Sequence, residues 1–218
     1  DGVVLHATLV NADIIKRLND IDFPYVVIGN INLDFPSTWV DIDNNYAGKL
    51  ACKHMLDMGY SKIAFIGGTP TETVSNQRIE GYKKQLISSY IPINPQYIMN
   101  GMGTDEDGYQ CMKKLLQLKP MPDAVICIND YTAFGAIKAL QESNLKLPDE
   151  MGIITFDNFP LAPYMTPSLT SIDIDTFVLG VRAGEMIMDK VKGNMVHKHV
   201  RISPDIIVRE STSRNKSL

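Results

Sequence analysis

Two adjacent polar residues, Asn129 and Asp130, follow an apolar segment at 124–128 and stand directly before an expected helix. The Asn129 amide both donates and accepts hydrogen bonds, whereas an ionised Asp130 carboxylate only accepts them. In an open α/β sheet, small ligands bind at the carboxyl ends of strands, beside helix N-termini. The pair therefore suits the neighbouring hydroxyls of a sugar. The alternative is that both residues only cap the helix, as Asn and Asp often do.

Other residues with reactive side chains do not indicate an enzyme or a metal site. No nucleophile–base pair accompanies the polar strand ends, and Gly67-Gly68 is not a phosphate loop because no Lys-Ser/Thr follows it. His197 and His199 alternate on an expected strand and so face one side, but without a third ligand nearby they are a weak metal signal. We predict that the chain is not an enzyme and uses no cofactor or metal.

Composition limits the class of protein. The 218 residues are 44% hydrophobic and 21% charged, enough for one large domain or two small lobes. The net charge of −4 lacks the basic character of a stand-alone nucleic-acid binder. Apolar runs are strand-sized and no signal peptide is visible, so we expect no membrane association. Cys52, Cys111 and Cys127 are expected to be reduced core residues in a cytoplasmic protein.

Strand-like and helix-like segments alternate along the chain, which favours parallel α/β layers. The expected strands are 2–5, 25–29, 39–42, 63–66, 97–99, 124–128 and 152–156, with alternating apolar residues over 200–208 finishing the fold. The expected helices are 12–19, 46–58, 76–89, 105–118, 130–143 and 176–192, and the N-cap candidates of the second are Asp43, Asn44 and Asn45. The polar tail Ser211–Leu218 is expected to be poorly ordered.

An ordered set of segments along nearly the whole chain points to one family. The segments are Asp1–Leu5, Pro24–Gly29, Val40–Asn44, His54–Ile63, Arg78–Tyr82, Pro122–Val125, Asn129–Ala136, Leu147–Asp149, Phe156–Asn158, Pro167–Ile172 and Ile207–Thr212. In this order and spacing the chain resembles the effector-binding domain of the lactose-repressor-type (LacI/GalR) bacterial transcription regulators. Members of this family are usually repressors.

The resemblance implies two Rossmann-like lobes of parallel sheet flanked by helices, a periplasmic-binding-protein-like fold of type I with an effector in the cleft. Crossings are expected near 42–45, 158–163 and 193–197. The early lobe would combine 1–42 and 164–193, the later lobe 43–163 and 194–212, with 213–218 a flexible tail. The family's helix-turn-helix, hinge helix and first strand–helix units are absent from this sequence. We therefore expect a truncated early lobe, with upstream residues missing, and no operator binding by this chain alone.

Three later-lobe residues carry over from the family as ligand contacts. Arg78, three residues before Gly81, matches the effector-binding arginine, and its planar fork of donors suits paired hydroxyls or a carboxylate. Its alternative role is a surface arginine paired with a glutamate. Asn129 carries over as the ligand-contacting amide. Asp157 carries over as a hydroxyl acceptor, although Asp157-Asn158 would also serve well in a turn.

Early-lobe candidates have weaker support. His6 ends the first expected strand, and Asn30 follows the second. Trp39, the only tryptophan, could stack on a sugar or could lie in the core. Phe159 and Tyr164 are further aromatic candidates near the second crossing.

The resemblance implies a regulator that senses a small molecule, most simply a mono- or disaccharide, as a homodimer in the cytoplasm. The ligand would shift lobe closure and thereby operator affinity. The Val26–Gly29 ending and Trp39 before Val40-Asp41 look most like maltose-type sugar regulators. A nucleobase or a phosphoprotein are other possible effectors. The alternative from another class is a periplasmic-type sugar-binding protein of a transporter, which shares this fold.

Overall fold

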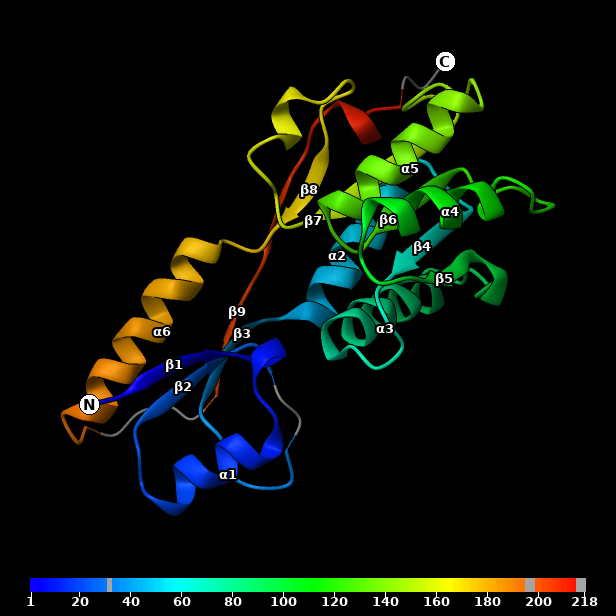
Figure 1. The fold of residues 1–218 in the computed structure, drawn as a ribbon. Helices are drawn as coiled ribbons and strands as arrows, with labels where there is room; N and C mark the ends of the chain where they lie inside the picture. The colour runs from blue at the N-terminus through cyan, green and yellow to red at the C-terminus, as the bar shows by residue number, and fades with distance from the viewer. Residues whose placement is uncertain (31–32, 195–198, 215–218) are drawn as a thin grey trace. The chain divides into compact units, whose positions relative to one another are not determined.

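The computed structural model describes residues 1–30, 33–194 and 199–214, and the chain divides into two compact units (Figure 1). The first unit comprises Asp1–Asp43 and Asp175–Ser203, and the second comprises Asn44–Ile174 and Pro204–Leu218. Each unit has its own sheet flanked by helices. The predicted α/β class, with mainly parallel strands, is confirmed.

The first unit is built on a four-stranded parallel sheet in the order β1-β2-β3-β9. Its strands are β1 (Val3–His6), β2 (Tyr25–Ile28), β3 (Trp39–Ile42) and β9 (His199–Ile202), and its helices are α1 (Ala12–Asp20), α6 (Thr176–Val191) and the short 3-10 segment η1 (Ala7–Leu9). Alternate residues of β2 face opposite layers: Val27 packs with Ile15 of α1, while Val26 packs with Ala183 of α6. The two helices therefore cover opposite faces of this sheet.

The second unit is built on a six-stranded sheet in the order β10-β8-β7-β6-β4-β5. Its strands are β4 (Ile63–Gly67), β5 (Ile98–Asn100), β6 (Ala124–Cys127), β7 (Gly152–Phe156), β8 (Thr170–Asp173) and β10 (Asp205–Ile207). All neighbouring pairs are parallel except β10 with β8. The central strands β4, β6 and β7 are buried throughout, as expected where helices cover both faces.

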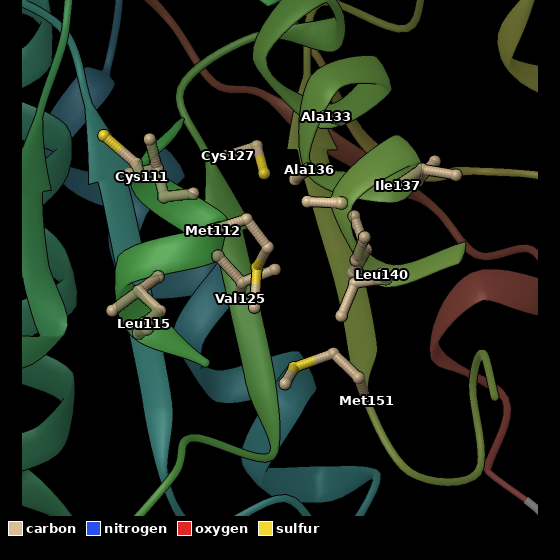
Figure 2. Close-up of a cluster of buried hydrophobic side chains, with 14 of the residues drawn as sticks. Cys111, Met112, Leu115, Val125, Cys127, Ala133, Ala136, Ile137, Leu140 and Met151 are labelled. Carbon is tan, nitrogen blue, oxygen red and sulfur yellow. The ribbon is translucent and has the colours of Figure 1, made fainter. Parts of the chain in front are cut away.

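Paired helices cover the two faces of this second sheet. They are α2 (Asn44–Asp57) and α3 (Thr73–Ser88) on one face and α4 (Asp105–Leu115) and α5 (Asp130–Glu142) on the other, with 3-10 segments η2 (Pro95–Tyr97), η3 (Ala162–Tyr164) and η4 (Glu210–Thr212). Figure 2 shows the face covered by α4 and α5, where Met112 of α4 and Leu140 of α5 pack with Val125 of β6. None of the helices in the described ranges is long and apolar enough to cross a membrane.

A glycine pair sets the spacing of α2 and α3. A Cβ added at Gly48 would overlap the Arg78 carbonyl, and one added at Gly81 would overlap the Asn45 carbonyl. Only glycine allows the two helix backbones to approach this closely. The close approach holds the backbone of Arg78 beside α2.

Two of the three expected crossings differ from the division of the structure. The first division, after Asp43, falls within the expected 42–45. The second and third fall after Ile174 and Ser203 rather than at 158–163 and 193–197.

Strand pairing explains the difference. The segment after residue 163 returns to the second sheet, because β8 pairs with β7 and β10. Strand β9 instead pairs with β3 and so belongs to the first unit. The early-lobe range 164–193 and the later-lobe range 194–212 therefore each begin about ten residues too early, since long-range pairing partners leave no local signal.

The beginning of the C-terminal tail is more ordered than expected. Ser211 and Thr212 are buried, and the Ser211 hydroxyl donates to the Ile153 carbonyl at 2.7 Å. The predicted poor order of 211–218 is therefore wrong for Ser211 and Thr212. Residues 215–218 of the predicted flexible tail lie outside the described residues.

Candidate functional site

The candidate site lies at the carboxyl ends of β6 and β7, which are parallel neighbours in the second sheet. Because parallel strands end at the same edge of a sheet, Ile128 after β6 and Asp157 after β7 lie at one edge. Arg78 of α3 reaches both ends: its Nη1 donates to the Ile128 carbonyl at 2.8 Å and lies 3.7 Å from Asp157 Oδ1. Two of the predicted site residues, Arg78 and Asp157, are thus brought together.

Arg78 is a buried arginine held by several protein groups rather than a surface residue. It is 5% exposed, and its Nε donates to Asn44 Oδ1 at 3.0 Å. The guanidinium carbon also lies 4.2 Å from the centre of the Phe156 ring, within cation–π range. A buried cation needs such partners to offset its lost hydration.

Asn44 is a further residue of the candidate site, and the sequence did not reveal its contact with Arg78. It was expected only as an N-cap candidate, whereas its side chain orients the Arg78 guanidinium. The available signal was the run of polar residues Asp43-Asn44-Asn45 at a strand-to-helix junction.

Asp157 combines partial exposure with a charged neighbour. Its side chain is 34% exposed, against 6% for Arg78. Burial raises the pKa of the Asp157 carboxyl above its usual value, and the Arg78 charge partly opposes this shift. The two groups form an ion pair at 3.7 Å, and the carboxylate keeps part of its surface exposed. The carboxylate can therefore accept a hydrogen bond from a ligand.

Asn129 has the capping role that was its alternative interpretation. Its Oδ1 accepts from the Thr132 N–H at 2.9 Å, at the start of α5. Its Nδ2 donates to the Gly103 carbonyl at 2.9 Å. These bonds use the amide oxygen and one of the two amide hydrogens, so any contact with a ligand stays a prediction.

Asp130 belongs to the interior. It is 1% exposed, and its Oδ2 accepts from the Phe159 N–H at 2.9 Å. Burial raises the pKa of its carboxyl to about 6, with the nearby Asp157 charge acting in the same direction. Asp130 therefore ties the N-terminus of α5 to the segment that comes after Asp157.

Two part-exposed aromatic rings, Phe159 and Tyr131, contact each other next to the start of α5. Phe159 is 37% exposed and Tyr131 is 52% exposed, and their ring centres lie 5.5 Å apart in an edge-to-face arrangement. Part-exposed rings of this kind offer an apolar face to a sugar or a flat ligand. Tyr164, the other aromatic candidate, is 82% exposed on η3.

The three candidates of the first unit lie in different surroundings. Trp39 is 5% exposed, packs in the core with Ile15, and stacks on His199 at 4.6 Å. His6 is exposed, and its Nδ1 forms a hydrogen bond with Thr8 Oγ1 at 2.8 Å. Asn30 is half-buried, and its backbone N–H donates to a carboxylate oxygen of Asp41.

Metal-binding and thiol chemistry find little support in the described residues. Within the described ranges, no group of three His, Cys, Asp or Glu side chains could hold a metal ion. His197, one of the pair considered for metal binding, lies outside these residues. All three cysteines are buried and free, and burial raises the pKa of Cys52 to about 12. A thiol in this state is unreactive.

Sequence comparison places the chain among bacterial regulators. A family model described as a periplasmic binding protein-like domain matches residues 52–212. The HTH-type transcriptional repressor PurR of Histophilus somni strain 2336 is 37% identical over 78% of this chain, and PurR of Haemophilus influenzae strain PittEE is 32% identical over 97%. The chain spans only 51% and 64% of the lengths of these two proteins.

Solved structures give the same grouping. A LacI-family regulatory protein from Chloroflexus aggregans has a TM-score of 0.92 at 31% identity, covering 99% of this chain and 77% of that one. The transcriptional regulator CelR in complex with cellobiose has a TM-score of 0.88 at 26% identity, covering 97% and 65%. A LacI-family regulator from Enterococcus faecium with bound ribose has a TM-score of 0.88 at 27% identity, covering 99% and 81%. The matched proteins are regulators rather than enzymes.

Proposed function

The chain belongs to the LacI family of transcription regulators through its periplasmic binding protein-like domain, and we propose that it senses a small polar effector through Arg78 and Asp157. In this proposal the chain is the effector-binding part of a longer regulator, usually a repressor, whose operator affinity changes when the effector binds. Operator DNA is contacted by a helix-turn-helix outside the given sequence. The regulator acts in the cytoplasm as a homodimer and is not an enzyme.

The observation that carries the proposal is the donor–acceptor pair at the two strand ends. A hydroxyl can accept a hydrogen bond from a guanidinium while donating one to a carboxylate. Arg78 and Asp157 provide these two groups 3.7 Å apart, with the carboxylate the more exposed. Neighbouring hydroxyls of a sugar match this arrangement, and Phe159, two residues after Asp157 in the sequence, forms a part-exposed aromatic pair with Tyr131.

Asn129 is a further proposed contact with the ligand. Asn129 has a second amide hydrogen besides the one that Gly103 accepts. His6, Asn30 and Trp39 are assigned to the effector by the family resemblance alone.

The effector class is proposed as a mono- or disaccharide. Similar regulators have been solved with cellobiose and with ribose, which supports a sugar. The relatives with the highest identities are instead named PurR, so a nucleobase is the competing ligand class. The maltose-type branch expected from the residues around Trp39 stays a prediction.

A thermal-shift panel tests the proposal. The probes are ribose, glucose, maltose, cellobiose, hypoxanthine, guanine and glucose 6-phosphate, because a ligand that binds only the folded state raises the melting temperature by mass action. A rise with a sugar supports the proposed class, and a rise with hypoxanthine or guanine alone would replace it with a nucleobase. If no probe raises the melting temperature at millimolar concentration, the proposal of a small polar effector fails.

A further inference from the structure

The turn that carries Asp157 has an unusual backbone. Asp157 and Asn158 have φ values of +88° and +52°, a region that residues other than glycine rarely occupy. Such conformations persist only where the surrounding structure over-determines them, and they concentrate at functional sites. The contacts that hold this turn therefore bear on the position of the Asp157 carboxylate.

Three consecutive backbone N–H groups of the turn are each bound by a different group. The bonds run from Asp157 to the Ile172 carbonyl at 3.0 Å, from Asn158 to Ser171 Oγ at 2.9 Å, and from Phe159 to Asp130 Oδ2 at 2.9 Å. Strand β8 supplies the first two acceptors and helix α5 supplies the third. The backbone of the turn is thus fixed on two sides.

A fourth contact comes from the C-terminal segment. Arg209 Nη2 donates to Asn158 Oδ1 at 2.8 Å, and Arg209 Nη1 donates to the Leu169 carbonyl. The planar fork of the guanidinium allows it to bind both acceptors at once, which a lysine ammonium on a flexible stem does not reproduce. Arg209 therefore cross-links the Asp157 turn to the residue that precedes β8.

Arg209 is itself firmly anchored. Its N–H donates to Thr170 Oγ1 at 2.9 Å, and the same hydroxyl donates to the Arg209 carbonyl at 3.0 Å. Two residues later, Ser211 Oγ accepts from the Thr170 N–H at 2.9 Å. Because its backbone is hydrogen-bonded to β8, the Arg209 guanidinium is held in a fixed position next to Asn158.

We infer that Arg209 is a positioning residue for the effector site, which holds the Asp157 turn in its strained conformation through Asn158. The inference rests on the proposed function, because it assigns Arg209 to the ligand contact made by Asp157. Arg209 touches no ligand itself in this account. Its removal lets the turn relax and moves the Asp157 carboxylate away from Arg78.

Amide hydrogen exchange measured by NMR tests the inference without any ligand. In Arg209→Gln, the amides of residues 157–159 should exchange roughly ten-fold faster or more, the effect expected for one lost charge-assisted hydrogen bond. Amides of the central strand β6 should keep their rates. The matched control is Arg214→Gln, which removes the same charge from the same segment, where Arg214 lies over the Tyr60 ring instead. This control should leave residues 157–159 unchanged.

An equal increase in the exchange rates of all second-unit amides in Arg209→Gln would overturn the inference, since Arg209 would then stabilise the whole unit rather than the turn. Unchanged rates at 157–159 would also overturn it. If Arg209→Gln does not fold, Asn158→Gly replaces it, because glycine accepts the positive φ and lacks the side-chain oxygen that Arg209 binds. The same faster exchange at 157–159 is then expected, and unchanged rates would contradict the inference.

A second measurement separates this inference from the proposed function. The thermal shifts produced by ribose, maltose, cellobiose and hypoxanthine are compared between wild type and Arg209→Gln. A probe that stabilises wild type should stabilise the variant much less, and an equal shift would overturn the positioning role. If no probe stabilises wild type, the proposed function fails, whereas the exchange rates still decide whether Arg209 positions the turn.

Discussion

The ends of β6 and β7 carry the same two residue types in opposite order, Asn129-Asp130 and Asp157-Asn158, yet they serve different purposes. At the β6 end both side chains are bound within the protein: Asn129 caps α5, and Asp130 is 1% exposed. At the β7 end Asp157 keeps 34% of its side chain exposed. Side chains of equal hydrogen-bonding capacity therefore differ in their availability to a ligand.

The segment after each strand causes this difference. Helix α5 begins at Asp130, shortly after β6 ends at Cys127, and the Asn129 side-chain oxygen accepts from an N–H of its first turn. A turn with positive φ values comes after β7 instead, and β8, α5 and Arg209 supply its partners. Because other segments satisfy this backbone, the Asp157 side chain is not needed as a cap.

The largest effect is expected for Arg78, the residue that joins the two strand ends. Arg78→Ala removes donors to Ile128 and Asn44 and the contact with the Phe156 ring. We expect a loss of about 3 kcal/mol in the free energy of unfolding, because buried acceptors lose their partner. Urea denaturation followed by far-UV circular dichroism measures this loss. Tryptophan fluorescence is unsuitable, because the single tryptophan, Trp39, lies in the first unit and Arg78 in the second.

Arg78→Lys is the matched control for this prediction. It keeps the positive charge near Asp157 but lacks the planar fork that reaches both Asn44 and Ile128. An intermediate stability is expected. A loss below about 1 kcal/mol for Arg78→Ala, typical of a surface arginine, would contradict the account of a buried link.

A pH-dependent effect of intermediate size is expected for Asp130, which links the two strand ends through Phe159. Its pKa is about 6 in the folded protein, against an ordinary 3.8. The folded state therefore keeps a proton that the unfolded state releases. Stability from this group is complete below about pH 4 and falls as the pH rises to about 6.

Asp130→Asn should remove this dependence, because the neutral amide can still accept from the Phe159 N–H. At pH 8 the variant should be more stable than wild type by about 2 to 3 kcal/mol, and the gain should shrink toward pH 4. Urea denaturation at several pH values gives the difference. Because His54 is present in both proteins, its own pKa shift cancels in that difference. A variant that is less stable than wild type at pH 8 would contradict this account, because it would show that the ionised carboxylate stabilises the folded state.

The smallest effect is expected for Asn129, whose two roles can be separated by two substitutions. Asn129→Ala loses the cap on Thr132 and the bond to Gly103, so the free energy of unfolding should fall by about 1 to 2 kcal/mol. Asn129→Ser keeps a capping oxygen and should cost less. If the serine variant keeps wild-type stability but loses thermal shift with a bound probe, Asn129 also contacts the ligand. If it keeps both, the residue is only a cap.

Much of this site was visible in the sequence because it depends on local patterns. The apolar runs before Asn129 and Asp157 predicted β6 and β7 to within a residue, and the polar residues after them marked the edge of the sheet where the candidate site lies. The resemblance to LacI-type regulators was confirmed by the family match and by the structural neighbours. Arg78 was identified from that resemblance, although its burial beneath the edge was not.

Other features depend on pairings that local patterns do not encode. Strand pairing, rather than local sequence, sets the unit to which β8 and β9 belong, so two of the three expected crossings differ from the division of the structure. The hydrogen bond from Arg209 to Asn158 joins two segments that lie far apart in the sequence, with β8 and α6 among the elements between them. The positive φ at Asp157 likewise reflects tertiary contacts, since its residue type only permits that conformation.

The central claim, that Asp157 binds the effector, is tested most directly by titration calorimetry. The most stabilising probe of the thermal-shift panel is titrated into wild type and into Asp157→Asn, which keeps the shape of the side chain and tolerates the positive φ. We expect binding to weaken roughly 100-fold, because a charged acceptor is lost, with no fall in melting temperature. Equal affinity in the two proteins would contradict the claim and would place the ligand away from the end of β7.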